Sequence, residues 1–281
     1  MFRRKDLFDP DIYRSNNLDL AHLTSAHALR AHFEQHGRAE PRIFGRTETT
    51  SQYLSMKWLR GQGIEVGAGR SPTPLFGAAT AVNADIDSGE VFGTAGVSHR
   101  YSIDDPVPPA LKGRFDFVIA SHVLEHADGM IRAVENLLDL ARPGGLVYIT
   151  VPDMRFLVDA QWMPYFDMAH HREEYDTPGK YDGMHDKLAL DHVRANITTI
   201  APDEQLVSGG QVRAADIFRM LEQGEGGENR FMHHKHTYDP DGWNGLFVDI
   251  QRFLAKRFSI AETRYGMERY DCHFILRNNG N

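Results

Sequence analysis

The amino-acid sequence predicts an α/β fold with a mostly parallel sheet. Between residues 61 and 153, short apolar runs alternate with helical stretches, a pattern typical of strands joined by right-handed crossovers. Near the C-terminus, residues 258–264 and 271–277 alternate around Tyr265-Gly266, which predicts an antiparallel strand pair that closes the sheet. The chain of 281 residues is 41% hydrophobic and 25% charged, as expected for a globular protein.

The chain divides into a helical N-terminal extension, residues 1–60, and a main domain, residues 61–281. In the extension we expect a helix over residues 18–36. Its apolar stripe is formed by Leu20, Leu23, Leu29 and Phe33. Within the main domain, residues 154–240 are polar and rich in histidine, aspartate and tyrosine, which predicts a lid or substrate-binding insertion.

Apolar runs bounded by glycine or polar residues predict the strands of the main domain. A helix is expected over residues 129–141, where apolar residues recur at helical spacing and Arg142-Pro143-Gly144-Gly145 follows. Another helix is expected over residues 243–255. The expected buried strands are residues 64–66, 81–84, 115–120 and 146–151.

Charge and cysteine content exclude several classes of protein. The net charge of −8 argues against a binder of nucleic acid or of anionic membranes. The single cysteine, Cys272, cannot form an internal disulfide, which favours a reducing compartment. No apolar stretch has the place of a signal peptide or the length of a membrane span. We therefore expect a cytoplasmic protein with no membrane insertion and no nucleic-acid partner.

A glycine-rich turn follows the first predicted strand. Gly67 permits a tight turn, and Gly69 lets a ligand approach the backbone. A dinucleotide-binding fingerprint would have a third glycine where this chain has Pro72, which lowers the case for a nicotinamide cofactor. Asp85 ends the second strand and is placed to accept two hydrogen bonds from ribose hydroxyls, or to cap the next turn.

Polar residues also follow the third and fourth predicted strands. Ser121 and His122 come directly after one of them, and Asp153 directly after the other. Ligands of open α/β sheets bind at the carboxyl ends of parallel strands, so these side chains are expected to face the same crevice. His126, four residues further along, is interpreted as a structural histidine with satisfied hydrogen bonds.

Four motifs in this order resemble those of class I S-adenosylmethionine-dependent methyltransferases: EVGAGRS, AVNADID, FDFVIASHVLEH and ARPGGLVYITVPD. The resemblance implies a Rossmann-like, mostly parallel sheet of seven strands with the C-terminal antiparallel pair. It also implies S-adenosyl-L-methionine as cofactor and S-adenosyl-L-homocysteine as product. The implied cofactor-binding residues are Glu65, Gly67, Ala68, Gly69, Asp85, Ile86, Asp104, Ser121 and His122.

The same resemblance implies a role for most of these residues. The two glycines would pass under the methionine part of the cofactor, and Glu65 would hold that loop and the amino group. Asp85 would bind the ribose, and Asp104 would lie near the adenine. Ser121 and His122 would flank the transferable methyl group.

Three longer phrases, LRGQGIEVGAGRSPTPL, VPDMRFLVD and HHKHTYDPDGW, resemble bacterial methyltransferases of surface-glycan and sugar-decorating pathways. That resemblance implies methylation of a hydroxyl on a sugar or another small molecule by direct displacement, assisted by a general base. Arg155 and Asp159 are the expected substrate-binding residues; Arg155 would pair with a substrate phosphate or carboxylate, or form a surface salt bridge.

The base candidates are Asp153 at the end of the fourth predicted strand, and Asp159 and several histidines in the insertion. His234 and His236 stand two residues apart, so in an extended segment both rings would lie on one face. The pair could instead hydrogen-bond within the lid, or join His233 and other ligands in a metal site, which is not favoured. The expected catalytic residues are His236, His234, His192 and Asp153.

Two other functions remain as alternatives. One is a nucleotide-dependent oxidoreductase, against which Pro72 and the ARPGG segment count. The other is a non-catalytic partner subunit that binds S-adenosylmethionine to stabilise a complex. A homodimer is compatible with the helical N-terminal extension.

Overall fold

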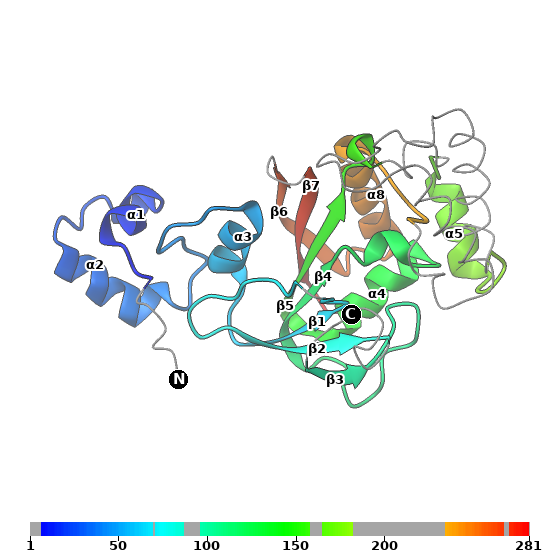
Figure 1. Ribbon diagram of the computed structural model, residues 1–281, viewed down its shortest axis with the longest axis horizontal. Helices are drawn as coiled ribbons and strands as arrows, with labels where there is room; N and C mark the ends of the chain where they lie inside the picture. The colour runs from blue at the N-terminus through cyan, green and yellow to red at the C-terminus, as the bar shows by residue number, and fades with distance from the viewer. Residues whose placement is uncertain are drawn as a thin grey trace, which may run out of the picture.

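A computed structural model describes residues 7–69, 71–86, 96–157, 165–181, 234–266 and 270–280. Its centre is a seven-stranded sheet in the order β3-β2-β1-β4-β5-β7-β6 (Figure 1). The strands are β1 (Gln62–Val66), β2 (Thr80–Asp85), β3 (Val97–Arg100), β4 (Phe115–Ser121), β5 (Ala141–Pro152), β6 (Phe258–Gly266) and β7 (Asp271–Asn278). Strands β1 to β5 pair in parallel, and β7 is antiparallel to both β5 and β6. The predicted fold class is thereby confirmed.

Helical segments both precede the sheet and connect its strands. Before β1 lie α1 (Pro10–Ser15), η1 (Leu18–Leu20), α2 (Ala26–His32), η2 (Phe33–Gly37) and α3 (Thr50–Trp58). Between β4 and β5 lie η3 (Leu124–His126) and α4 (Met130–Leu140). After β5 come η4 (Met154–Phe156), α5 (Met168–Asp176) and α8 (Pro240–Phe253). Figure 1 shows α1 and α2 at one end of the molecule and α5 at the other.

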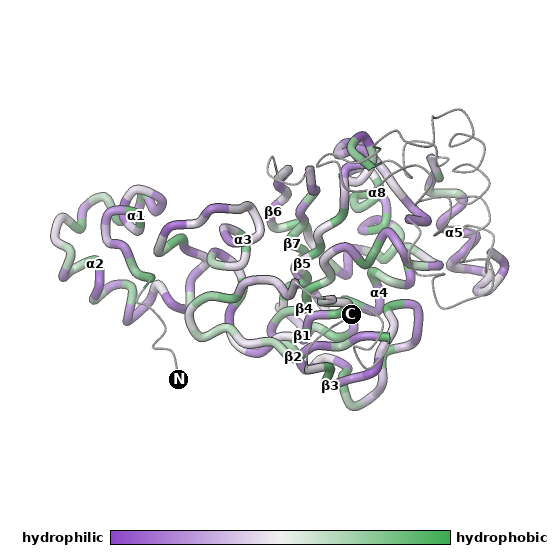
Figure 2. Tube along the Cα trace, in the orientation of Figure 1, coloured by the Kyte–Doolittle hydropathy of each residue, from purple (hydrophilic) through white to green (hydrophobic). Residues whose placement is uncertain are grey.

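Helices cover both faces of the sheet. Helices α4 and α8 pack on one face, where Val134, Leu137 and Phe247 join the central core cluster and are fully buried. Helix α3 packs on the other face, where Leu54 contacts the cluster that contains Phe117. The hydrophobic segments accordingly concentrate along the central strands (Figure 2). Helix α4 lies within one residue of its predicted range because its apolar residues recur at helical spacing.

The single helix predicted for residues 18–36 is wrong. The structure has three short helices there, η1, α2 and η2, because the Ser25 side chain accepts a hydrogen bond from the amide of Ala28 and starts a new helix. The predicted stripe is nonetheless apolar core: Leu20, Leu29 and Phe33 are buried in a cluster of their own, and Leu23 packs against it.

The connection from β1 to β2 also departs from the predicted alternation of strands and helices. In residues 67–69 and 71–79 the structure describes no helix. Pro74 lacks an amide donor and disfavours helical backbone at Thr73. Thr73 is instead held by the Glu65 carboxylate, which accepts hydrogen bonds from the Thr73 amide at 2.9 Å and from its hydroxyl at 2.7 Å.

Among the helices of the described residues, none combines the length and the apolar character needed to cross a bilayer.

Candidate functional site

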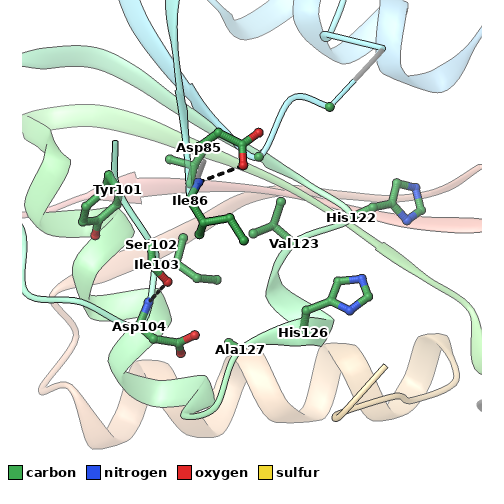
Figure 3. A pocket seen from close by; sticks show the side chains of 13 residues that line it. Asp85, Ile86, Tyr101, Ser102, Ile103, Asp104, His122, Val123, His126 and Ala127 are labelled. Carbon is green, nitrogen blue, oxygen red and sulfur yellow. Dashed lines mark hydrogen bonds between the residues drawn. The ribbon is translucent and has the colours of Figure 1, made fainter. Parts of the chain in front are cut away.

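A cavity of about 250 Å³ opens at the carboxyl ends of β1 to β4. It lies where the order of the sheet reverses, between β1 and β4, which is the usual ligand site of an open parallel sheet. Figure 3 shows Tyr101 and Asp104 at one end of the cavity and the rings of His122 and His126 at the other. Asp85 lies between the two ends.

The turn after β1 forms one wall of the cavity. Gly67 has φ 66° and Gly69 has φ 53°, in the left-handed region that favours glycine. A Cβ atom on Gly67 would lie 2.5 Å from Cγ2 of Val123, whereas a Cβ on Gly69 would meet nothing within 4 Å. Backbone and ligand can therefore approach closely here.

We expect Gly67→Ala to lower the free energy of unfolding by about 2 to 3 kcal/mol, because backbone strain adds to the clash with Val123. Gly69→Ala is the matched control, since it carries the same kind of strain without the clash, and should lose only about 1 kcal/mol. Urea unfolding of both variants measures the difference. Equal losses would mean that the Val123 contact does not constrain the loop.

Glu65, Ala68 and Ser121 are buried or half-buried near the cavity without lining it. Glu65 is only 2% exposed, and its hydrogen bonds to Thr73 close the glycine turn. Burial raises the pKa of Glu65 despite those hydrogen bonds. Its position therefore matches the loop-holding part of the role that the resemblance implies.

Asp85 and Ile86 line the cavity at the end of β2. Asp85 is 4% exposed, and its Oδ1 accepts a hydrogen bond of 2.8 Å from the Ile86 amide. Through that hydrogen bond Asp85 caps the turn after β2, which is one of the two roles that the sequence allows. It leaves the carboxylate at the cavity wall, where a ligand hydroxyl can reach it (Figure 3).

Asp104 lines the far end of the cavity, and its neighbour Asp105 is exposed. The Asp104 carboxylate accepts a hydrogen bond of 2.9 Å from the Asp128 amide. Burial, with a smaller effect from the Asp128 charge, raises the pKa of Asp104 to about 6. Beside it, the hydroxyl of Tyr101 is buried and has no hydrogen-bond partner among the described residues.

His122 lies at the opposite end, directly after β4. Its φ is 55°, a strained value for a residue other than glycine. Nδ1 lies 3.3 Å from Oε1 of Glu125, and Nε2 lies 3.4 Å from Oδ1 of Asp271. Burial lowers the pKa of His122, but the two carboxylates outweigh it and raise the pKa to about 10.

A second group of side chains adjoins His122. Glu125 is completely buried, His126 lines the cavity, and the rings of His126 and His234 stack with centroids 4.9 Å apart. The amides of Lys235 and His236 both donate to the carbonyl oxygen of Glu125, at 2.8 and 3.1 Å. Those two bonds fix the segment that carries His234 against η3.

His236 lies in a different cluster, away from the residues that line the cavity. It is fully buried, and its Nε2 lies 3.0 Å from Oε1 of Glu174. The rings of His234 and His236 thus do not share the face expected of an extended segment, because the backbone bends at Lys235 and His236 to reach the Glu125 carbonyl.

Asp153 and Arg155 pair with each other. Asp153 is 4% exposed, caps η4 through the Arg155 amide and accepts from the Arg155 guanidinium, with Nη2 to Oδ2 at 2.6 Å. Arg155 therefore forms the salt bridge that was the alternative to a substrate contact. The other expected residues, His192 and Asp159, lie outside the described residues.

Sequence reasoning missed part of the cavity wall. The short strand β3 has no continuous apolar run, so the sequence does not predict it. The cavity residues that follow β3 were therefore not recognised as lying at the carboxyl end of a strand. The sequence predicts a structural role for His126, whereas the structure places it in the cavity wall; it is the last residue of the segment HVLEH, whose first residue, His122, lines the same cavity. The missed lining residues are Val66, Tyr101, Ser102, Ile103, Val123, His126 and Ala127.

Comparison with known proteins gives one family. The family model described as "Methyltransferase domain" matches residues 43–184, half of the chain. A search of curated proteins finds no match.

Several solved structures are similar in fold. A protein from Rhodobacter sphaeroides, provisionally named a Zn-dependent alcohol dehydrogenase, has a TM-score of 0.45 and 14% identity over 79% of this chain and 86% of that chain. An S-adenosylmethionine-dependent methyltransferase from Mesorhizobium loti has a TM-score of 0.39 and 12% identity over 77% of this chain and 90% of that chain. A possible histamine N-methyltransferase from Thermotoga maritima has a TM-score of 0.39 and 12% identity over 79% of this chain and 83% of that chain.

Proposed function

Because the chain belongs to the methyltransferase-domain family and is an S-adenosylmethionine-dependent methyltransferase, we propose that it methylates a hydroxyl group of a sugar or another small molecule. The observation that carries this proposal is the group of histidines at the β4 end of the cavity, where His122 and His126 line the wall and His234 stacks behind. A protonated hydroxyl is a poor nucleophile, so its methylation needs groups that hold or remove the proton.

The residues around the cavity fit S-adenosylmethionine. With glycine at 67 and 69, the turn carries no side chain beside the cavity where the methionine part would pass, and the buried Tyr101 hydroxyl and the Asp104 carboxylate offer polar partners at the adenine end. Asp85 would hold the ribose. When bound, the cofactor supplies a methyl group on a positively charged sulfur.

The chain's own residues then position the acceptor. If the adenine lay near Asp104 and the ribose at Asp85, the remaining end of the cofactor would lie toward His122 and His126, which line the opposite end of the cavity. Among the expected base candidates within the described residues, His234 is the one beside that end, since His236 and Asp153 are buried in pairs of their own. We assign His234 a positioning role: its ring stacks on His126 and would hold that imidazole where the acceptor binds.

An acceptor panel tests the proposed function. The full chain is incubated with S-adenosylmethionine and either sugars and small alcohols or the corresponding amines, and S-adenosylhomocysteine formation is measured. Turnover with hydroxyl acceptors is the expected result. Turnover confined to amines would contradict the assignment to oxygen.

We expect His234→Asn to lower turnover about 100-fold, the loss expected when a group beside the reacting atoms is displaced by about 1 Å. The affinity for S-adenosylhomocysteine should stay within about twofold, since the cofactor end lies beyond His126. His22→Asn, on an exposed part of the N-terminal extension, is the control. Unchanged turnover in the His234 variant would remove it from the reaction.

A further inference from the structure

Glu125 is an unusual buried carboxylate. It is 0% exposed, and its carboxylate has imidazole neighbours: Nδ1 of His122 lies 3.3 Å and Nε2 of His126 lies 4.0 Å from Oε1, while within the described residues Oε2 has no hydrogen-bond partner. A buried carboxylate in this state is strongly disfavoured unless a cation compensates it. The His122 ring lies within ion-pair distance at 3.3 Å but is shared with Asp271, which leaves most of the lone pairs of Glu125 unused.

Two imidazoles lie next to that carboxylate. One ligand atom each from Glu125, His126 and His234 lies within 4.8 Å of the other two. Two ligands at about 2.1 Å from one metal ion are about 3 to 4 Å apart, so a small contraction of the three side chains would enclose a cation. The distance of 4.0 Å between Nε2 of His126 and Oε1 of Glu125 is already in that range.

We propose that Glu125, His126 and His234 bind a divalent transition-metal ion beside the cofactor cavity. Two imidazole nitrogens and one carboxylate oxygen suit Zn²⁺, Mn²⁺, Co²⁺ or Fe²⁺ better than Mg²⁺ or Ca²⁺, which prefer oxygen ligands. His122 would orient the ligating carboxylate from outside, as the residues behind metal ligands commonly do. Because His126 lines the cavity, a metal ion held by these residues would lie beside the cavity wall.

A metal at this place would bind the acceptor hydroxyl and lower its pKa. That role rests on the proposed function, whereas the binding of the metal does not. The two ideas therefore fail separately: metal binding is measured without any acceptor, and the acceptor panel reports on the reaction.

A neighbouring cluster provides a matched control. His170, Glu174 and His236 also bring three potential ligand atoms together. There, however, the carboxylate is satisfied, since Oε2 of Glu174 lies 2.9 Å from Nδ1 of His171 and Oε1 lies 3.0 Å from Nε2 of His236. We interpret it as a hydrogen-bonded network that fastens α5 to the segment before α8.

The test is a titration of the full, EDTA-treated and desalted chain with Co²⁺, followed by visible absorption and by metal analysis after gel filtration. We expect one Co²⁺ per chain, with affinity reduced at least about 100-fold in Glu125→Gln and unchanged in Glu174→Gln. His234→Asn gives a second reading should Glu125→Gln fail to fold. Three results would overturn the proposal: wild-type protein that retains no Co²⁺, binding as tight as that of wild type in both Glu125→Gln and His234→Asn, or loss of binding in Glu174→Gln alone.

Discussion

Replacing Asp85 with alanine is expected to weaken S-adenosylhomocysteine binding about 100-fold. A hydrogen bond to a charged group contributes about 1.5 to 3 kcal/mol, so two such bonds at the lower end of this range give about 3 kcal/mol, a factor of slightly more than 100. The affinity is measured by calorimetric titration of the full chain. Asp85→Asn should fall between wild type and alanine, because its amide keeps one acceptor oxygen.

Asp105→Ala is the control for this experiment. Asp105 is an exposed carboxylate near the cavity that does not line it, so its loss changes the local charge by the same amount without removing a contact. A comparable loss in both variants would mean that net charge, and not the Asp85 contact, attracts the ligand. Wild-type affinity in Asp85→Ala would place the ribose elsewhere in the cavity.

The central strands of the sheet could be predicted because each one is indicated by a short run of neighbouring residues. Ile64, Val118 and Val147 belong to short, mostly apolar runs, and such runs occur where a strand is buried on both faces. The strand β3 escaped prediction for the opposite reason: it lies at the edge of the sheet, is only half-buried and carries Ser98, His99 and Arg100.

The acceptor side of the site was harder to predict because its contacts join residues distant in sequence. His126 stacks on His234, which lies more than a hundred residues further along the chain. The Lys235 amide donates a hydrogen bond to the carbonyl oxygen of Glu125. Spacing alone placed His234 and His236 on one face. Their separation results from the bend at Lys235 and His236, whose amides donate to the Glu125 carbonyl oxygen, and a sequence pattern does not record that contact.

The affinity for the cofactor should also depend on pH through Asp104. Its pKa of about 6 means that the carboxylate is ionised above this pH and can accept a hydrogen bond from the adenine amino group. Below pH 6, S-adenosylhomocysteine affinity should fall by up to about tenfold for each pH unit, since the protonated form must first lose its proton. Calorimetry between pH 5 and pH 8 measures this, and Asp104→Asn should remove most of the dependence.

The stability of the ligand-free protein should change in the opposite direction. A carboxyl group whose pKa is raised by folding binds its proton more tightly in the folded state, so its contribution is full below the unfolded pKa of 3.8 and is lost as the pH rises to about 6. At pH 8, Asp104→Asn should therefore raise the free energy of unfolding by about 1 to 3 kcal/mol while weakening cofactor binding. General acid denaturation would lower stability and affinity together as the pH falls, so opposite slopes identify Asp104 as the titrating group. Parallel slopes, or a variant that titrates like wild type, would assign the effect to another residue.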